Sequence, residues 1–245
     1  IMSSDWSSDV CSSDLHFWKT RKSAHEKQPL SEKTDQGERA GVTAGKNLDG
    51  FVDMVAKVVI ANGIPASSIM LQKKVLTLPG FFRPTKSWDL VVMHDGILVA
   101  AVEFKSQAGP SFGNNFNNRA EEVIGNAHDL RVAFREKAFG EQTQPFLGWL
   151  MLVEDCDMSQ MPVANREPHF PVFEDFKDAS YMKRYGLLCE KLILENLYNS
   201  ACLLASKRTD ISTGNYTSMS ATTSLRSFVS KLAGHVAAHI SMTKS

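Results

Sequence analysis

The chain reads WDLVVMHDGILVAAVEFK from Trp88 to Lys105. Two apolar runs flank the sequence His94-Asp95-Gly96, and Asp-Gly between such runs is typical of the turn of a β-hairpin. Side chains alternate between the two faces of a strand, so Glu103 and Lys105 share one face. The stretch therefore predicts a β-hairpin with Asp89 at the head of its first strand and an acid and a lysine at the end of its second.

These charged side chains follow runs of Val, Leu, Ile and Ala, where burial is costly unless a charge is paired or bound to a metal ion. Asp89 and Glu103 together can hold one or two Mg²⁺ ions, and Lys105 is expected to point into the same space. That combination suits a magnesium-dependent phosphodiesterase. For so short a motif, the structural alternative is an edge strand whose charged side chains face water.

The segment that follows the lysine is rich in polar side chains. Residues 106–119 read SQAGPSFGNNFNNR and are predicted to form a loop that opens at the metal site. The candidates for DNA binding in it are Gln107, Asn114, Asn115, Asn117, Asn118 and Arg119. In the major groove, Asn or Gln can bond adenine bidentately and Arg can bond guanine. The alternative is a turn without a partner, since Asn tolerates left-handed backbone and caps helices.

Thirteen residues separate Asp89 from Glu103-Phe104-Lys105, and this spacing resembles the PD-(D/E)xK nuclease signature, with Trp88 where the signature has proline. The segment 102–122 as a whole resembles the Xho-type family of type II restriction endonucleases. The resemblance extends to residues 16–18, 45–51 and 216–220, so it covers most of the chain from about residue 16 onward.

The resemblance implies a homodimer that cuts both strands of the palindrome CTCGAG with Mg²⁺. It also implies a restriction-modification system with a cognate DNA methyltransferase in the same host. The implied fold is α/β: a restriction-endonuclease-like core with a central mixed β-sheet flanked by helices, and additional C-terminal helices. Two other functions stay open, namely a catalytically inactive DNA-binding module and a repair or recombination nuclease of the same superfamily.

The motif can be transferred residue by residue. It assigns Asp89 and Glu103 as catalytic metal ligands and Lys105 as the group that orients or activates the attacking water. The backbone carbonyl of Phe104 is a further candidate metal ligand. Because the ordinary pKa of lysine is about 10.4, we expect Lys105 to position the water rather than to act as a general base.

Secondary candidates lie outside the motif. Asp53 falls on a helix predicted from the apolar spacing between Leu48 and Ile60, where a solvated polar face is the alternative to a metal ligand. Asn215 and Tyr216, in a segment rich in Ser and Thr, are further DNA-binding candidates. Glu121 or Glu122, in the first turns of the next predicted helix, is expected to approach the active site or Arg119. The alternative is a solvent-facing first helical turn, which favours acids in any case.

Composition is compatible with these predictions without selecting them. The chain has 245 residues, a hydrophobic share of 43% and a formal net charge of zero. It has the length for one well-packed domain, no transmembrane run, and no basic excess, which argues against nonspecific packaging of nucleic acid. Its four cysteines form no CxxC pair, so we predict a reduced, cytoplasmic protein.

The first fifteen residues differ from the rest, because the tripeptide Ser-Ser-Asp occurs three times within them. We predict that residues 1–15 are a low-complexity, non-native segment and that residues 16–245 form a single domain.

Five further elements follow from apolar patterns. We predict a strand at 69–78, helices at 117–139 and 189–204, a strand at 146–153 and a terminal helix at 225–240.

Overall fold

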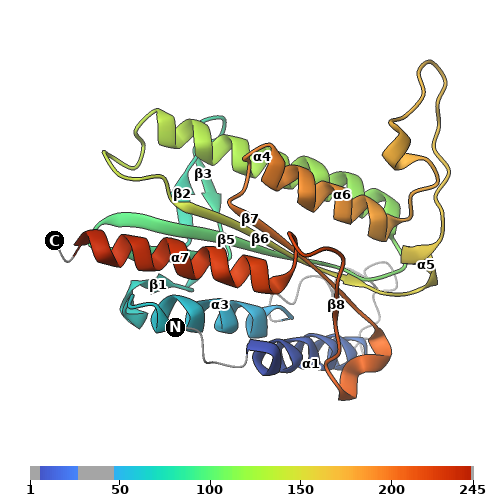
Figure 1. The fold of residues 1–245 in the computed structure, drawn as a ribbon, viewed down its shortest axis with the longest axis horizontal. Coiled ribbons are helices and arrows are strands. Elements are labelled where there is room, and N and C mark those ends of the chain that lie inside the picture. The colour runs from blue at the N-terminus through green and yellow to red at the C-terminus, as the bar shows by residue number, and fades with distance from the viewer. Residues whose placement is uncertain (1–5, 27–46, 244–245) are drawn as a thin grey trace, which may run out of the picture.

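The computed structural model describes residues 6–26 and 47–243 (Figure 1). The helices are α1 (Trp6–Glu26), α3 (Asp49–Ala61), α4 (Phe112–Arg135), α5 (Asp157–Gln160), α6 (Tyr181–Leu194) and α7 (Leu225–Thr243). The strands are β1 (Ile69–Met70), β2 (Thr77–Pro79), β3 (Thr85–Ser87), β4 (Leu90–His94), β5 (Ile97–Gln107), β6 (Phe146–Glu154), β7 (Ser200–Ser206) and β8 (Thr217–Ser218).

A six-stranded sheet with the order β1-β4-β5-β6-β7-β8 forms the centre of the protein. The β5/β6 and β6/β7 pairs are parallel, and the β1/β4, β4/β5 and β7/β8 pairs are antiparallel. Strands β2 and β3 form a separate antiparallel pair. The predicted fold class, a mixed sheet flanked by helices and followed by a C-terminal helix, is confirmed.

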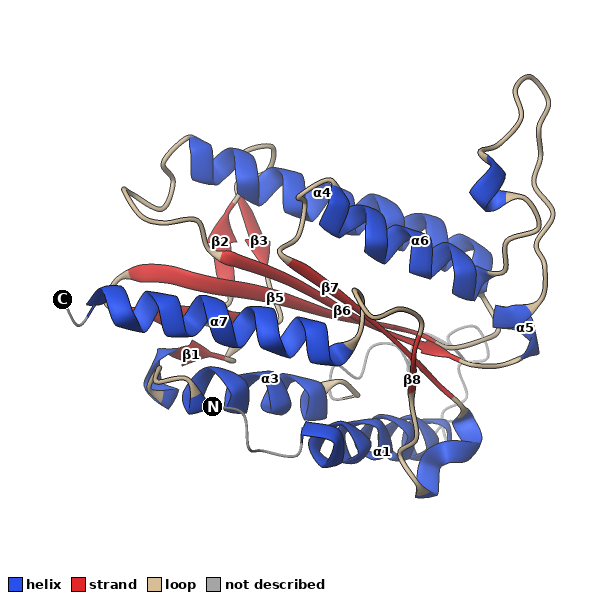
Figure 2. Ribbon diagram, in the orientation of Figure 1, coloured by secondary structure: helices blue, strands red, loops and turns tan. Residues whose placement is uncertain are grey.

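Helices cover both faces of this sheet (Figures 1 and 2). Helices α4 and α6 lie on one face, and α1, α3 and α7 lie on the other. All nine residues of β6 are buried, as expected for a central strand with both faces covered. Helix α4 joins the parallel strands β5 and β6 and is thus the crossover of a βαβ unit.

The predicted hairpin is formed by β4 and β5. Its turn residues Asp95 and Gly96 have φ values of 50° and 77°, which suit a tight turn between antiparallel strands. Strand β5 has eleven residues and outlasts its antiparallel partner, so its last residues pair with β6 alone. Within the described residues, no strand pairs with the edge of β5 beside Asp89.

Three predictions about local structure were wrong. Residues 106–119 are not one loop, because β5 continues to Gln107 and α4 already begins at Phe112. Residues 69–78 contain two short strands in place of one. The predicted helix at 189–204 is divided into the end of α6 and strand β7. Apolar residues there also fit a helical spacing, but the run 201–205 is continuous and buried in the sheet beside β6.

Helix α1 includes residues 6–15 of the predicted non-native segment, and residues 1–5 lie outside the described residues. Asp14 is fully buried and accepts a hydrogen bond from Ser206 Oγ at 2.8 Å. Trp18 Nε1 donates to the same hydroxyl at 2.7 Å. The structure therefore shows no boundary at residue 15, while the non-native origin of residues 1–15 stays a prediction.

Asp14→Asn is expected to stabilise the protein by about 2 kcal/mol at pH 7.5. Burial raises the pKa of the Asp14 carboxyl to about 6, against hydrogen bonds that favour its charged form. A raised pKa in the folded state means that this group's contribution to stability is lost as the pH rises from about 4 through 6. Urea unfolding of parent and variant at pH 4.5 and 7.5 measures the difference, which is expected to grow with pH. A pH-independent difference would contradict the assignment.

Two expectations concern the chain as a whole. All four cysteines are free thiols, in line with the absence of CxxC pairs. In the part of the chain that the structure describes, no helix combines the length and the apolar character that crossing a membrane requires.

Candidate active site

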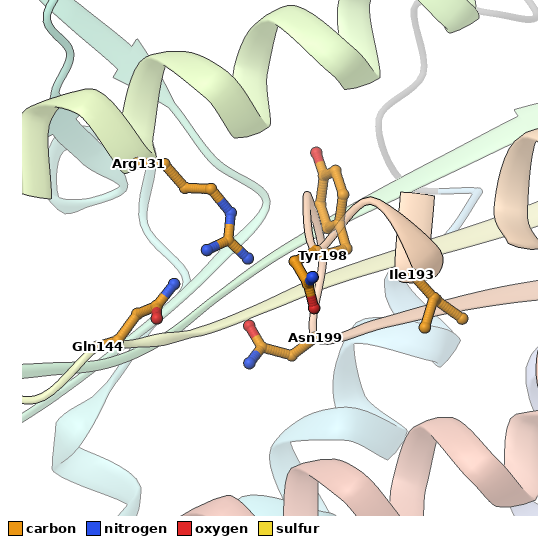
Figure 3. A pocket seen from close by; sticks show the side chains of 6 residues that line it. Arg131, Gln144, Ile193, Tyr198 and Asn199 are labelled. Carbon is orange, nitrogen blue, oxygen red and sulfur yellow. The ribbon is translucent and has the colours of Figure 1, made fainter. Parts of the chain in front are cut away.

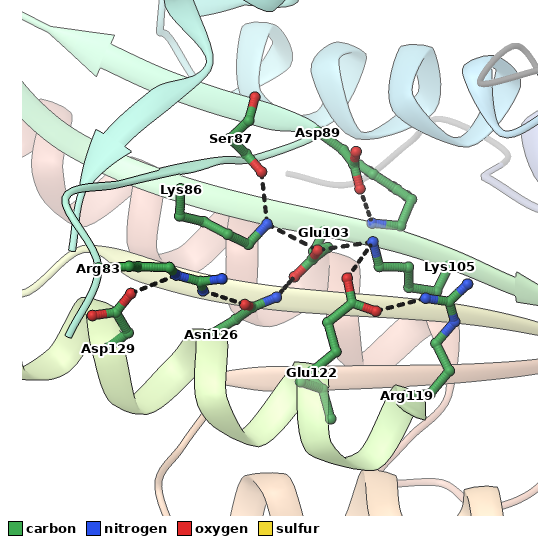
Figure 4. Close-up of polar contacts among 12 residues, drawn as sticks. Arg83, Lys86, Ser87, Asp89, Glu103, Lys105, Arg119, Glu122, Asn126 and Asp129 are labelled. Atoms are coloured by element: carbon green, nitrogen blue, oxygen red, sulfur yellow. Dashed lines mark hydrogen bonds and ion pairs between the residues drawn. The ribbon is translucent and has the colours of Figure 1, made fainter. Parts of the chain in front are cut away.

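Asp89, Glu103 and Lys105 come together where β5 extends beyond β4 (Figure 4). Asp89 Oδ2 accepts a hydrogen bond from the backbone N–H of Phe104 at 2.8 Å. In a strand, the N–H and C=O of one residue point to the same side. The Phe104 carbonyl therefore points toward Asp89, at the edge of β5 that extends beyond β4.

Glu103 is the most enclosed acid of the site, with a side chain that is 1% exposed. Its Oε1 lies 2.9 Å from Lys105 Nζ and 3.0 Å from Lys86 Nζ, and its Oε2 accepts from Asn126 Nδ2 at 2.8 Å. Burial alone would raise the pKa of the carboxyl, but the two lysines outweigh burial and lower it. Glu103 is thus a carboxylate that is held in place from both of its oxygens.

Lys105 lies between two carboxylates. Its Nζ is 3.0 Å from Glu122 Oε1 as well as 2.9 Å from Glu103 Oε1. Burial would lower the pKa of Lys105, but the negative charges of Glu103, Glu122 and Asp89 raise it. Lys105 therefore keeps its proton and can orient a water molecule as a cation. The pKa of Asp89 is raised, chiefly because surrounding groups desolvate its carboxyl, although the residue as a whole is exposed.

The structure adds residues that the sequence pattern did not single out. Lys86 comes from β3, which belongs to the separate two-stranded sheet, and Asn126 lies several turns along α4. Behind Asn126, Arg83 donates to its Oδ1 and also to Asp129 Oδ2, the latter at 2.8 Å. Of the two acids expected to approach the active site or Arg119, Glu122 contacts Lys105 and also Arg119, at 2.6 Å, whereas Glu121 is exposed.

The chemistry of the donor set fits Mg²⁺. This ion is usually held by one or two carboxylates and completes its shell with water and substrate phosphates. Asp89, Glu103 and the Phe104 carbonyl supply three oxygen donors of the required kind. Among the residues that the structure describes, there is no group of three or more His, Cys, Asp or Glu side chains that could hold a metal ion by themselves.

The asparagines predicted to bind DNA lie on the first turns of α4. Asn114, Asn117 and Asn118 are exposed, and their spacing places them on one face of the helix. Asn115 is half-buried. Gln107 is buried, and its side-chain amide donates to the backbone carbonyl of Ala108 at 3.1 Å. This contact leaves Gln107 less able to reach DNA than the three exposed asparagines.

The remaining candidates lie away from the acidic pair. Asp53 is exposed on α3, on the face of the sheet opposite α4. Asn215 is exposed just before β8, at the far edge of the sheet from β4, and Tyr216 packs against the core of the α3 and α7 face. The structure thus does not bring Asp53, Asn215 or Tyr216 together with Glu103.

Two cavities lie beside α4. One of about 340 Å³ is at the amino ends of β6 and β7 (Figure 3). It is lined by Arg131, Gln144, Ile193, Asn196, Tyr198 and Asn199. The other, of about 320 Å³, adjoins the site and includes Glu122 and Asn126 in its lining. Of these two cavities, the second is lined by residues that contact Glu103 and Lys105.

Comparisons of the sequence with a family model and with known proteins all point to restriction endonucleases. The family model described as "Restriction endonuclease XhoI" matches residues 27–218. The chain is 55% identical over 180 residues to the type II restriction enzyme XhoI of Xanthomonas vasicola, covering 73% of this chain and 72% of that protein. It is 46% identical over 216 residues to the type II restriction enzyme BstVI of Geobacillus stearothermophilus, covering 86% of this chain and 96% of that protein. No solved structure shows a significant match. The chain therefore belongs to the XhoI family of restriction endonucleases.

Proposed function

We propose that this chain is a type II restriction endonuclease that hydrolyses both strands of duplex DNA at the palindrome CTCGAG and depends on Mg²⁺. The observation that carries the proposal is the Glu103 carboxylate, which is buried where β5 extends beyond β4, beside Asp89, and contacts Lys105 at 2.9 Å. An acid pair with an adjacent cation is suited to hydrolysing a phosphodiester. The similarity to a relative named XhoI supports the choice of target sequence.

Asp89, Glu103 and the Phe104 carbonyl are the residues that would hold the metal. Bound Mg²⁺ supplies a water molecule of lowered pKa and neutralises charge on the scissile phosphate. The charges of Glu103 and Glu122 keep Lys105 protonated, so its role is to orient the nucleophile and not to remove its proton. Glu122 positions Lys105 from the side opposite Glu103.

The proposed function includes partners. A two-fold symmetric site is read by a two-fold pair of protomers, so we propose a homodimer. Such an enzyme would act on DNA in the cytoplasm, together with a cognate methyltransferase that protects the host's own CTCGAG sites.

Digestion of a plasmid that carries a single CTCGAG site, in the presence of Mg²⁺, tests the proposal. The expected result is one linear product from this plasmid and none from a matched plasmid in which the site is changed at two positions. Degradation of both plasmids would indicate a repair or recombination nuclease. A shift of the CTCGAG duplex in Ca²⁺ without cutting in Mg²⁺ would indicate an inactive DNA-binding module.

Replacing Asn114, Asn117 and Asn118 together by alanine is expected to weaken binding to CTCGAG by at least about tenfold. The reason is that one bidentate contact between Asn and adenine contributes about 1–3 kcal/mol of discrimination. Binding to a scrambled duplex is expected to change little, because asparagine adds no charge toward phosphates. Gel-shift titrations of both duplexes in Ca²⁺ measure the two affinities.

A control for the triple variant is Asn196→Gly, which removes an amide side chain at the cavity beside Tyr198 and suits the positive φ of 54° at this position. An equal loss on both duplexes would show that the asparagines act on the DNA backbone. No loss on either duplex would remove this face of α4 from the recognition surface.

A further inference from the structure

Two lysines lie against a single carboxylate oxygen. Lys105 Nζ and Lys86 Nζ are 2.9 and 3.0 Å from Glu103 Oε1, and the two side chains are 19% and 13% exposed (Figure 4). The proposed function explains Lys105 but gives no role to Lys86. A second buried ammonium at the same oxygen is costly to desolvate, so its position requires an explanation.

The two lysines differ in the partners that remain to them when Glu103 binds another group, such as a metal ion. Lys105 has a second carboxylate, Glu122 Oε1, at 3.0 Å. Lys86 donates to the backbone carbonyl of Ser87 at 2.6 Å and lies 4.7 Å from the centre of the Trp88 ring. In the described part of the chain, Glu103 is the one carboxylate within 4 Å of Lys86 Nζ.

The balance of charges in the site supports the same distinction between the two lysines. Asp89, Glu103 and Glu122 are opposed by Lys86, Lys105 and Arg119, so three negative groups face three positive ones. A divalent cation at Glu103 would compete with both ammonium groups for Oε1 and would repel them. Because Lys105 retains Glu122, Lys86 is the cation that loses its only carboxylate partner.

We propose that Lys86 is a second catalytic lysine, which turns from Glu103 to a phosphate of the bound DNA when Glu103 binds the metal. This inference rests on the proposed function. The phosphate is the anion that accompanies the metal ion into the site, and a lysine binds it as a point charge. The Trp88 ring keeps the Lys86 ammonium near the site while it changes partners.

The salt dependence of DNA binding provides a test that does not depend on cleavage. Each phosphate contact adds about 0.9 to the slope of log affinity against log salt concentration. Binding of an uncut duplex is measured over a series of NaCl concentrations, once in Ca²⁺ and once in EDTA, for the parent, Lys86→Gln and Lys86→Arg. The control is Lys191→Gln, an exposed lysine on α6 with a side chain that is 69% exposed.

In Ca²⁺, Lys86→Gln is expected to reduce the slope by about 0.9, whereas Lys86→Arg and Lys191→Gln retain the parent's slope. In EDTA, where Lys86 stays with Glu103, all four proteins are expected to show the same slope. Folding is not expected to limit the test, since Glu103 keeps Lys105 and Asn126 in the glutamine variant.

Two outcomes would overturn the inference: an unchanged slope for Lys86→Gln in Ca²⁺, or an equal reduction in Ca²⁺ and EDTA. Each measurement is made on a CTCGAG duplex and on a scrambled duplex. The parent's ratio of affinities for the two duplexes tests the proposed target, while the slopes test Lys86 on either duplex because both carry phosphates. Failure of the proposed target sequence is therefore distinguishable from failure of the proposed role of Lys86.

Discussion

Lys105→Ala is expected to lower the rate of CTCGAG cleavage by about 10³-fold, because it removes a cation aimed at the reacting groups. Binding of the uncut site in Ca²⁺ is expected to remain within about tenfold of the parent, since Lys105 supplies at most one phosphate contact. The effect would thus fall on the chemical step. The measurements are single-turnover cleavage rates in Mg²⁺ and gel shifts in Ca²⁺.

The alanine variant is expected to stay folded, because each acid around Lys105 keeps another partner. Glu103 retains Lys86 at 3.0 Å and Asn126 at 2.8 Å, and Glu122 retains Arg119 at 2.6 Å. Removing one partner of a buried ion pair is strongly destabilising when it leaves the other charge unpaired. In Lys105→Ala, both carboxylates keep a cation or a hydrogen-bond donor, so this penalty does not arise. Thermal unfolding of the variant provides the check on this point.

Lys191→Ala is the matched control, since it removes a lysine from the exposed side of α6 and should leave cleavage unchanged. Cleavage by Lys105→Ala within about tenfold of the parent would show that Lys105 is not the catalytic cation of the motif. Loss of binding in Ca²⁺ to the same extent as loss of cleavage would instead make it a DNA-binding residue.

The central hairpin could be predicted because its determinants are local. An Asp-Gly turn between two apolar runs fixes the pairing of β4 with β5, and that pairing places Asp89 beside Phe104 across the strand edge. The eighteen residues from Trp88 to Lys105 therefore contain the information that brings the residues of the motif together. Their roles in metal binding and catalysis remain part of the proposed function.

Lys86 and Asn126 could not be predicted in this way. Lys86 reaches Glu103 because the β2/β3 pair packs over the end of β5, and Asn126 reaches it because α4 crosses the same face. Both contacts depend on how separate elements pack. A lone lysine or asparagine carries no periodicity that would distinguish it from a surface residue.

Residues 189–204, which are divided between α6 and β7, show a different limit of prediction from sequence. The apolar positions fit a helix as well as a buried strand, and periodicity alone does not separate the two for short runs. In the folded protein, β7 pairs with β6 along its whole length, so tertiary pairing decides the matter. A positive φ of 54° at Asn196 marks the place where the helix gives way to the turn before β7.

Asp129→Ala is expected to destabilise the protein by about 2–3 kcal/mol, because it removes the acid that binds the β2–β3 turn to α4. Asp129 Oδ1 accepts from the backbone N–H groups of Phe81 and Phe82 at 2.6 and 2.8 Å. Its Oδ2 accepts from Arg83 Nε at 2.8 Å. Removing the carboxylate leaves two backbone donors and a guanidinium without their partner.

The pH dependence of this loss follows from the same contacts. Burial would raise the pKa of Asp129, but the hydrogen bonds from Phe82, Arg83 and Phe81 outweigh it and lower the pKa. A lowered pKa means that the stabilisation is present above the ordinary carboxyl pKa and is lost as the pH falls through the lower, folded value. The parent and the alanine variant should therefore differ most near neutral pH and converge in acid.

Thermal unfolding at pH 7 and pH 3 measures both effects, with an expected decrease of the midpoint on the order of 10 °C at pH 7. Glu121→Ala, an exposed acid on the same helix, is the control and should shift the midpoint little. A loss of equal size at both pH values would mean that the side chain acts by packing and not by charge.

Asp129 also bears on the active site, through Arg83 and Asn126. Arg83 contacts both Asp129 and Asn126, and Asn126 holds the Oε2 oxygen of Glu103. Without Asp129, Arg83 is free to leave Asn126, and the Asn126 amide that donates to Glu103 Oε2 is then held less firmly. We therefore expect Asp129→Ala to slow cleavage even at temperatures where it is fully folded. An unchanged cleavage rate under those conditions would confine Asp129 to a structural role.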